Sequence, residues 1–272
     1  MVAKYGKCAV CGRYERLTFE HVPPRKALND RRIEICSAHD WLYRSAEQMP
    51  RGRIQQRGSG FPATCAKCNN DTGGWYGGEF GKWVFRGADV LTRYAGPALM
   101  DEDPQQHFVT AMFSRVRPLL FLKQVVYMLL VVNGHAFSDR NPELRRFALD
   151  RERVGLPGEY HFHLALLWGP YARHVGLGGK IDTDVGGSAM LSEIAFAPFS
   201  YTLRIGERLD SLPPCDISGF VEYGPSEVRD IELHLLIGFC HMPLPCDFRS
   251  RAAIAEDGGD IPGAWLFHDP SI

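Results

Sequence analysis

The spacing of apolar residues changes along the chain and predicts a rear part built from strands. From Glu159 onward apolar residues recur at every second position, with Tyr160, Phe162 and Leu164 alternating with more polar neighbours. A period of two is typical of strands that bury one face. We therefore predict a mainly antiparallel sheet. The expected strands are Tyr160–Trp168, Met190–Ala197, Tyr201–Ile205, Ile217–Tyr223 and Ile231–Phe239.

Two helices are expected ahead of this sheet, which makes the rear part α+β. Arg117–Asn133 is almost continuously apolar and predicts a buried helix, and Asn141-Pro142 begins a second helix that runs to Asp150. The most apolar stretch, Leu119–Val132, is interrupted by two polar residues. It is shorter than the roughly 20 apolar residues that span a bilayer.

The first hundred residues show shorter elements. Arg16–Val22 predicts a strand that stops at two prolines, with Glu20 and His21 at its exposed end. A helix is expected over Thr72–Tyr94. Its beginning is rich in glycine, which lowers helicity and suggests close approach by another backbone, most simply the strand that carries Glu20 and His21. Proline, glycine and acidic residues then cluster near 96–104 and predict a boundary between domains 1–98 and 99–272.

Residues 25–64 lie between these elements and are rich in arginine. A helix is predicted over Trp41–Met49, and a loop over Pro50–Pro62. Arginines of such a loop suit contacts with phosphates, although a plain surface loop would have the same composition. The candidate nucleic-acid contacts are Arg25, Arg51, Arg53 and Arg57.

Charge divides the chain in the same way. Residues 1–100 hold 16 Lys and Arg against 9 Asp and Glu, a net +7, and residues 101–272 hold 15 against 23, a net −8. A basic front part suits a polyanionic partner, or is simply an uneven surface. No secretory leader is recognised at the start, so we expect a cytoplasmic protein without a membrane partner, in which the eight cysteines stay reduced.

Four cysteines have the spacing of a metal site. Two CxxC pairs close a tetrahedral structural zinc site when they meet in space. A competing C-x-x-H pair leaves the ligand assignment open. The favoured ligands are Cys8, Cys11, Cys65 and Cys68, and the competing pair is Cys36 and His39. The order of knuckle, hairpin, knuckle and helix is that of a treble clef, in which the zinc would hold the helix start against the hairpin.

Three residues beside this zinc site suit phosphodiester hydrolysis. A carboxylate at Glu20 and an amide oxygen at Asn69 are hard ligands for Mg²⁺ or Mn²⁺. A metal held there would neutralise charge on a phosphate and on the leaving 3′ oxygen. A neutral imidazole at His21 would take a proton from the attacking water. An exposed strand end without function is the alternative for the acid–histidine pair.

At these residues the chain resembles the zinc-containing branch of the HNH (ββα-metal) endonucleases. The resemblance rests on Cys8-x-x-Cys11-Gly12, Leu17 to Pro24, and Cys65-x-x-Cys68-Asn69-Asn70, and covers roughly residues 5–95. It implies that Glu20 and Asn69 bind the catalytic metal, that His21 is the general base, that the four cysteines hold structural zinc, and that the products carry 5′-phosphate and 3′-hydroxyl ends. The long insertion, the missing helix histidine and the doubled asparagine depart from the family, so Asn70 is an alternative metal ligand or a brace.

We therefore expect an α+β endonuclease acting on DNA in preference to RNA. The rear domain would set specificity, form a homodimer or sense a signal, and restriction or phage defence is an analogy of architecture only. The competing hypothesis is a non-catalytic treble-clef module that binds nucleic acid or a protein.

Weaker candidates have simpler interpretations. His161 and His163 share a strand face that suits a metal but more readily a half-exposed polar surface, and Trp75 and Trp83 suit base stacking but more readily a core. Three further cysteines lack metal spacing and are expected to be buried: Cys215, Cys240 and Cys246.

Overall fold

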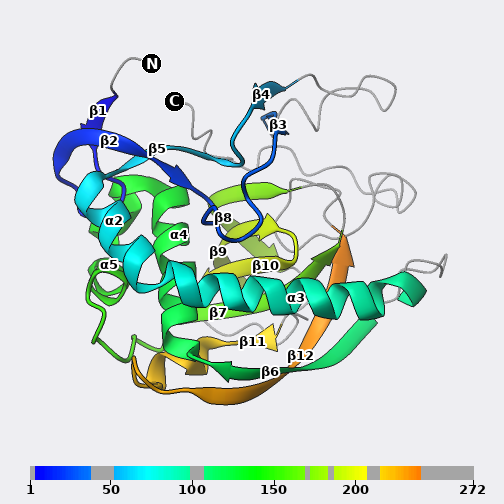
Figure 1. Cartoon of the computed structure of the whole chain (residues 1–272). Helices are drawn as coiled ribbons and strands as arrows, with labels where there is room; N and C mark the ends of the chain where they lie inside the picture. The colour runs from blue at the N-terminus through cyan, green and yellow to red at the C-terminus, as the bar shows by residue number, and fades with distance from the viewer. Residues whose placement is uncertain are drawn as a thin grey trace.

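The computed structural model describes six stretches of the chain. They are residues 4–37, 52–98, 107–168, 172–182, 187–206 and 215–239. The expected helix Trp41–Met49 and the expected contacts of Arg51 and His39 lie outside these residues. Within them the protein is α+β with mainly antiparallel sheets, as the sequence predicts (Figure 1).

The front part is a small antiparallel sheet followed by two helices. The sheet order is β1-β2-β5, with β2 in the centre. A separate two-stranded sheet, β3-β4, lies within the arginine-rich insertion. The bounds are β1 Tyr5–Lys7, β2 Tyr14–His21, β3 Ile33–Ile35, β4 Arg53–Gln55, β5 Gly60–Cys65, α2 Ala66–Trp75 and α3 Gly77–Ala98.

The helical segment begins earlier than expected and is broken. Helix α2 starts at Ala66, directly after the cysteine that ends β5, and the chain bends at Tyr76 before α3. The explanation offered for the glycines is wrong at the start of the segment, because a Cβ built at Gly73, Gly74 or Gly77 would meet nothing within 4 Å. A close approach occurs instead at Gly87, where a Cβ would lie 2.3 Å from the ring of Phe199.

The rear sheet has the order β6-β12-β7-β10-β9-β8, with β11 paired to β7. Every pairing is antiparallel except the one between β12 and β7. The expected strand Ile217–Tyr223 is wrong, since Ser218–Glu222 forms the 3₁₀ helix η1. Strands β6, β8 and β11 were not expected, and in the front part β4 and the beginning of β5 lie within the segment Pro50–Pro62 that was expected to be a loop. The bounds are β6 His107–Val116, β7 Tyr160–Trp168, β8 Arg173–Asp182, β9 Gly187–Phe196, β10 Phe199–Ile205, β11 Cys215–Asp216 and β12 Arg229–Phe239.

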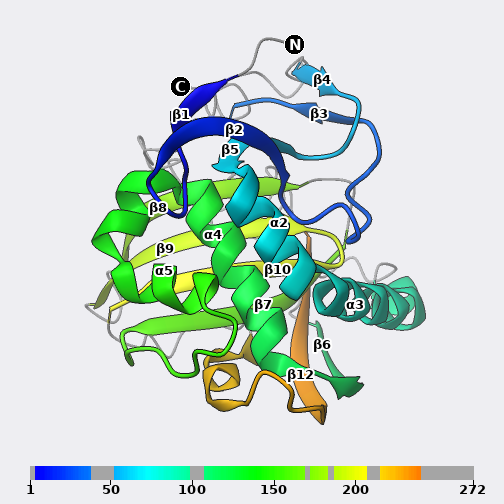
Figure 2. The same cartoon turned by 60° about the vertical axis from the view of Figure 1, so that its left-hand side comes forward.

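Helix α4, Pro118–Arg140, lies across this sheet with α2 beside it, and α5, Pro142–Leu149, packs next to it (Figure 2). Every residue of α4 from Pro118 to Val132 is buried. The helical segment breaks at Gly134, which has the non-helical angles φ 76° and ψ 179°, directly after the expected end at Asn133, and a further helical stretch continues to Arg140. By length and composition alone the whole segment could cross a membrane. Because 78% of its most apolar window is buried inside the fold, it has the character of a core helix.

The front and rear parts share one core. Buried residues of both, including Cys8, Trp83 and Tyr127, belong to the same hydrophobic cluster. Hydrogen bonds also cross between the parts: the Tyr76 hydroxyl donates to the carbonyl of Ala148 at 3.1 Å. The expected division at residue 98 stays a prediction about organisation along the chain, and helix α4 brings the rear part against the front sheet.

Candidate metal centre and active site

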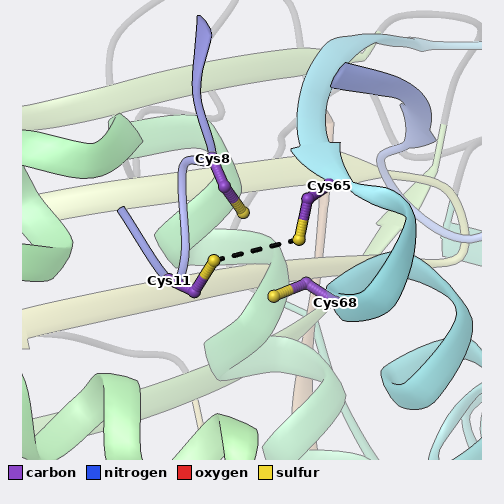
Figure 3. Close-up of side chains that lie close together, drawn as sticks. All are labelled: Cys8, Cys11, Cys65 and Cys68. Carbon is purple, nitrogen blue, oxygen red and sulfur yellow. Dashed lines mark hydrogen bonds between the residues drawn. The ribbon is translucent and has the colours of Figure 1, made fainter. Parts of the chain in front are cut away.

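Four cysteine side chains converge where the front sheet meets α2. Cys8 and Cys11 lie in the loop between β1 and β2, Cys65 ends β5, and Cys68 lies in the first turn of α2 (Figure 3). Their Sγ atoms all lie within 4.8 Å of one another, and those of Cys11 and Cys65 are 3.8 Å apart. Four thiolates around a tetrahedral zinc, at about 2.3 Å each, lie about 3.8 Å from one another. The cluster therefore has the size and chemistry of a metal site such as zinc requires.

Local backbone geometry explains how the first pair is presented. The amide of Cys8 donates to the carbonyl of Arg13, and the amide of Gly12 donates back to the carbonyl of Cys8 at 3.0 Å. Gly12 has φ +75°, a left-handed conformation that glycine adopts without strain. The resulting tight turn directs both thiols toward β5 and α2.

The thiols also influence one another. A hydrogen bond from Cys68 lowers the pKa of Cys8 to about 4, and the same contact together with burial raises the pKa of Cys68. Cys36 is not part of the cluster among the described residues. The structure therefore brings together the four favoured cysteines, and the alternative ligand His39 lies outside the described part of the chain.

Glu20 is not at an exposed end, as the sequence suggested, but buried, with 7% of its surface exposed. Its Oε2 accepts hydrogen bonds from the hydroxyls of Thr64 and Tyr127, each at 2.9 Å. Burial raises the pKa of Glu20 to about 7. The end of β2 is covered because Tyr127 of α4 packs against Glu20. Local sequence patterns did not predict this contact, since Tyr127 is 107 positions away along the chain.

His21 points to the other face of β2 and is only partly buried. Its Nε2 lies 2.9 Å from the carbonyl oxygen of Arg57, and its ring packs edge-on against Phe19, with centroids 4.8 Å apart. A carbonyl can only accept a hydrogen bond, so Nε2 carries the proton. Burial lowers the pKa of His21. The neutral imidazole therefore leaves Nδ1 as the proton acceptor.

Asn69 lies against the same strand. Its Nδ2 is 3.0 Å from Thr18 Oγ1 and 3.1 Å from the carbonyl oxygen of Phe19. Because that carbonyl can only accept, the amide nitrogen must face β2 and Oδ1 is turned away from that carbonyl. Asn70 is exposed, and its side chain makes no hydrogen bond within the described residues.

Hydrogen bonds connect these groups into one network. Asn69 donates to Thr18, whose hydroxyl donates to the carbonyl of Thr64 at 2.9 Å. The Thr64 hydroxyl in turn donates to Glu20. Sequence reasoning missed Thr64 and Tyr127, since neither belongs to a motif. Thr64 could have been found, because it directly precedes Cys65 of the cluster in the strand that pairs with β2.

The other candidates lie apart from this network. Arg25, Arg53 and Arg57 are exposed, and Arg25 is close enough to His21 to lower the pKa of that imidazole. Trp83 is fully buried and stacks on Phe121 at 4.3 Å, so it is a core residue. Three further candidates lie in the rear sheet: His161, His163 and Cys215. His163 is buried, whereas His161 and Cys215 are partly buried. Cys240 and Cys246 lie outside the described residues.

Comparisons of the chain with protein-family models, curated proteins and solved structures return no significant match. The interpretation of the site therefore depends on its own chemistry. It combines a four-cysteine cluster, an oriented neutral imidazole, and a carboxylate and an amide joined by one hydrogen-bond network.

Proposed function

We propose that this protein is a metal-dependent endonuclease of the HNH type, in which the four cysteines hold a structural zinc. The proposal is supported by the order of parts around the cluster. A knuckle leads into β2, β5 returns antiparallel to β2, and α2 begins at the second cysteine pair. This order is the one expected of a treble clef, in which a bound zinc would hold Asn69 on α2 against the strand that ends in Glu20 and His21.

The contact between His21 Nε2 and the carbonyl of Arg57 carries the proposal. A backbone carbonyl behind one ring nitrogen fixes the tautomer and the ring orientation, and leaves the other nitrogen basic. A general base for water needs this preparation, because the imidazole must be neutral and aimed before the reaction. The lowered pKa of His21 keeps it neutral at neutral pH.

Glu20 and Asn69 would hold the catalytic Mg²⁺ or Mn²⁺. Asn70 is the alternative amide ligand. Their donors are the hard oxygen atoms that these ions prefer. Both described hydrogen bonds to Glu20 fall on Oε2, which leaves Oε1 as the ligand atom. When bound, the ion supplies positive charge for the scissile phosphate and the leaving oxygen.

DNA is the proposed substrate, in preference to RNA. The front hundred residues carry a net charge of +7. Arg25, Arg53 and Arg57 are exposed on the insertion, and Arg25 and Arg57 lie near His21. Each arginine that neutralises a phosphate releases counterions and adds affinity without reading sequence. The rear part would add specificity, dimerisation or sensing, and a role in restriction or phage defence remains an analogy of architecture.

A plasmid assay tests the proposal. Wild type, His21→Ala and the control His234→Ala are incubated with supercoiled plasmid and Mg²⁺ or Mn²⁺. His234 is an exposed histidine of β12. We expect cutting by wild type and the control, and at least a 100-fold slower reaction for His21→Ala, since general base catalysis contributes roughly 10²–10⁴-fold. Equal cutting by all three proteins would contradict the assignment of His21.

The buried carboxylate favours a second candidate function. Glu20 receives two hydroxyl hydrogen bonds and is covered by α4, which is also how a purely structural acid would be held. In that case the front part is a zinc module that binds nucleic acid or a protein without cutting. Binding of plasmid in a gel shift, with no cutting over a range of divalent ions, would select this candidate.

A further inference from the structure

The β1–β2 hairpin carries a regular set of four exposed side chains on one face. Tyr5 lies opposite Arg16, and Lys7 lies opposite Tyr14. Residues directly opposite in an antiparallel pair share a face, as do residues two apart on one strand. Two aromatic rings and two cations therefore alternate in a square, which we call the hairpin patch.

The hairpin patch is open to solvent. Tyr5 is 60% exposed and Tyr14 72% exposed, and both cations are exposed as well. Single exposed aromatic residues are common on surfaces, but here two lie together with cations. The hairpin stands at the margin of the molecule beside β5 (Figures 1 and 2).

No acidic side chain shares the hairpin patch within the described residues of β1 and β2. Glu15 lies opposite Gly6, which places it on the reverse face, where it pairs with Arg13 at 3.5 Å. The acid nearest on the same face, Glu20, is buried. The patch therefore presents positive charge without a competing carboxylate, which suits an anionic ligand that also has flat apolar rings.

Unpaired nucleic acid matches this chemistry. Bases stack on tyrosine rings, and the phosphates between them pair with lysine and arginine. Diagonal positions such as Tyr5 and Tyr14 are about 7–8 Å apart in an antiparallel pair. The bases of a duplex rise only about 3.4 Å per step and leave no room for a ring between them. The spacing thus suits the splayed bases of a single strand.

The hairpin patch also continues toward the candidate active site. Arg16, Thr18 and Glu20 lie on the same face of β2, and the amide of Asn69 donates to Thr18. At about 3.3 Å per residue, Tyr14 and Arg16 lie about 13–20 Å along the strand from Glu20. A single-stranded nucleic acid bound to the patch and lying along β2 would extend toward Glu20 and Asn69.

We propose that the hairpin patch is a binding site for single-stranded nucleic acid. This deepens the proposed function, because it assigns an unpaired segment as the part of the substrate held beside the proposed nuclease centre. Binding at the patch itself does not require cleavage. The two ideas can therefore be tested separately.

Binding of a labelled oligo-dT strand and of a duplex of equal length is measured for the full chain by fluorescence anisotropy, without added divalent ions. We compare wild type with Tyr5→Leu/Tyr14→Leu, with Tyr5→Phe/Tyr14→Phe, and with the control Tyr94→Leu. Tyr94 is 50% exposed on α3. Thermal melting of each variant checks that it is folded.

Wild type should prefer the single strand. The leucine pair should weaken its binding about tenfold or more, since stacking on an aromatic ring contributes substantially per base. The phenylalanine pair and Tyr94→Leu should bind as wild type does. In Lys7→Gln/Arg16→Gln, the slope of log affinity against log salt should fall by about 1.4, or about 0.7 for each phosphate that is no longer neutralised.

Unchanged binding in the leucine pair, or a wild-type preference for the duplex, would overturn the proposal. The plasmid assay gives the independent result. A protein that binds the strand through the patch, but cuts neither the plasmid nor the oligo-dT strand with Mg²⁺ or Mn²⁺, supports the patch and refutes the nuclease. If wild type cuts DNA, and the leucine pair binds and cuts as wild type does, the nuclease proposal is supported and the hairpin patch is refuted.

Discussion

The hydroxyl of Tyr127 donates a 2.9 Å hydrogen bond to the carboxylate of Glu20, although the two residues are 107 positions apart. One lies in the centre of α4 and the other at the end of β2. The contact joins the rear part of the chain to the candidate active site. Any account of Glu20 must therefore include the helix that covers it.

Tyr127→Phe removes one of the two hydroxyl donors to Glu20 and adds no bulk. Loss of a hydrogen bond to a buried carboxylate should lower the free energy of unfolding by about 1–3 kcal/mol. Urea unfolding measures this change, with the exposed Tyr94→Phe as control. A change within about 0.5 kcal/mol of wild type, the usual range for surface substitutions, would show that the contact does not stabilise the fold.

The pH dependence of stability should reflect His174 on β8. Its Nε2 lies 3.4 Å from Ser59 Oγ, and burial lowers its pKa to about 4 from 6.5. Between these values the unfolded chain binds the proton and the folded protein does not. The stability that this group contributes is complete above pH 6.5 and is lost as the pH falls through 4, by about 3 kcal/mol.

His174→Gln should lose less stability on acidification than wild type, since glutamine does not titrate. The measurement is urea unfolding of both proteins at pH values above 6.5 and near 4. A difference between the two proteins that stays constant with pH would mean that His174 is not held neutral by the fold.

Much of the fold follows from local patterns, and the failures have physical causes. Strand β7 shows a clear period of two, and α4 a long apolar run. Strand β6 shows no alternation of apolar and polar residues, because its exposed face carries the apolar residues Phe108 and Met112, which are 56% and 55% exposed. Strand β8 contains several glycines and resembles a loop in sequence. Helix α2 begins within a zinc-type motif, where the cysteine cluster outweighs weak helical propensity.

The sequence predicted only those parts of the candidate site whose residues lie close together along the chain. The spacing of the cysteines predicted the cluster, and the position of Asn69 after Cys68 predicted its place near β2. The burial of Glu20 was not predictable, because Tyr127 reaches it through packing of distant elements. The orientation of His21 depends on the carbonyl of Arg57, and a backbone group has no signature in sequence.

The cysteine cluster predicts a contrast between two substitutions. Cys68→Ser should abolish bound zinc and unfold the front part, since a structural site contributes directly to folding. Cys36→Ser should keep zinc at the wild-type level, because Cys36 is outside the cluster. Metal analysis of the purified proteins and circular dichroism provide the readouts. Loss of zinc in Cys36→Ser would show that Cys36 is one of the zinc ligands.

The two asparagines should differ in the cleavage assay. Asn69 contacts β2 through Thr18 and Phe19, whereas Asn70 is exposed. Asn69→Ala should slow plasmid cutting about 10–100-fold, the usual effect of disturbing a metal site, and Asn70→Ala should leave the rate near that of wild type. The reverse order of effects would assign the amide ligand to Asn70.

The most direct test of the central claim is the pH dependence of plasmid cutting by wild type beside His21→Ala, each with its zinc content verified. We expect the wild-type rate to rise with pH, because the neutral imidazole of His21 and the ionised carboxylate of Glu20 are the active forms. The His21→Ala rate should be at least about 100-fold lower throughout. A wild-type protein that holds zinc but cuts no DNA with Mg²⁺ or Mn²⁺, or a His21→Ala protein with the same rate and profile, would contradict it.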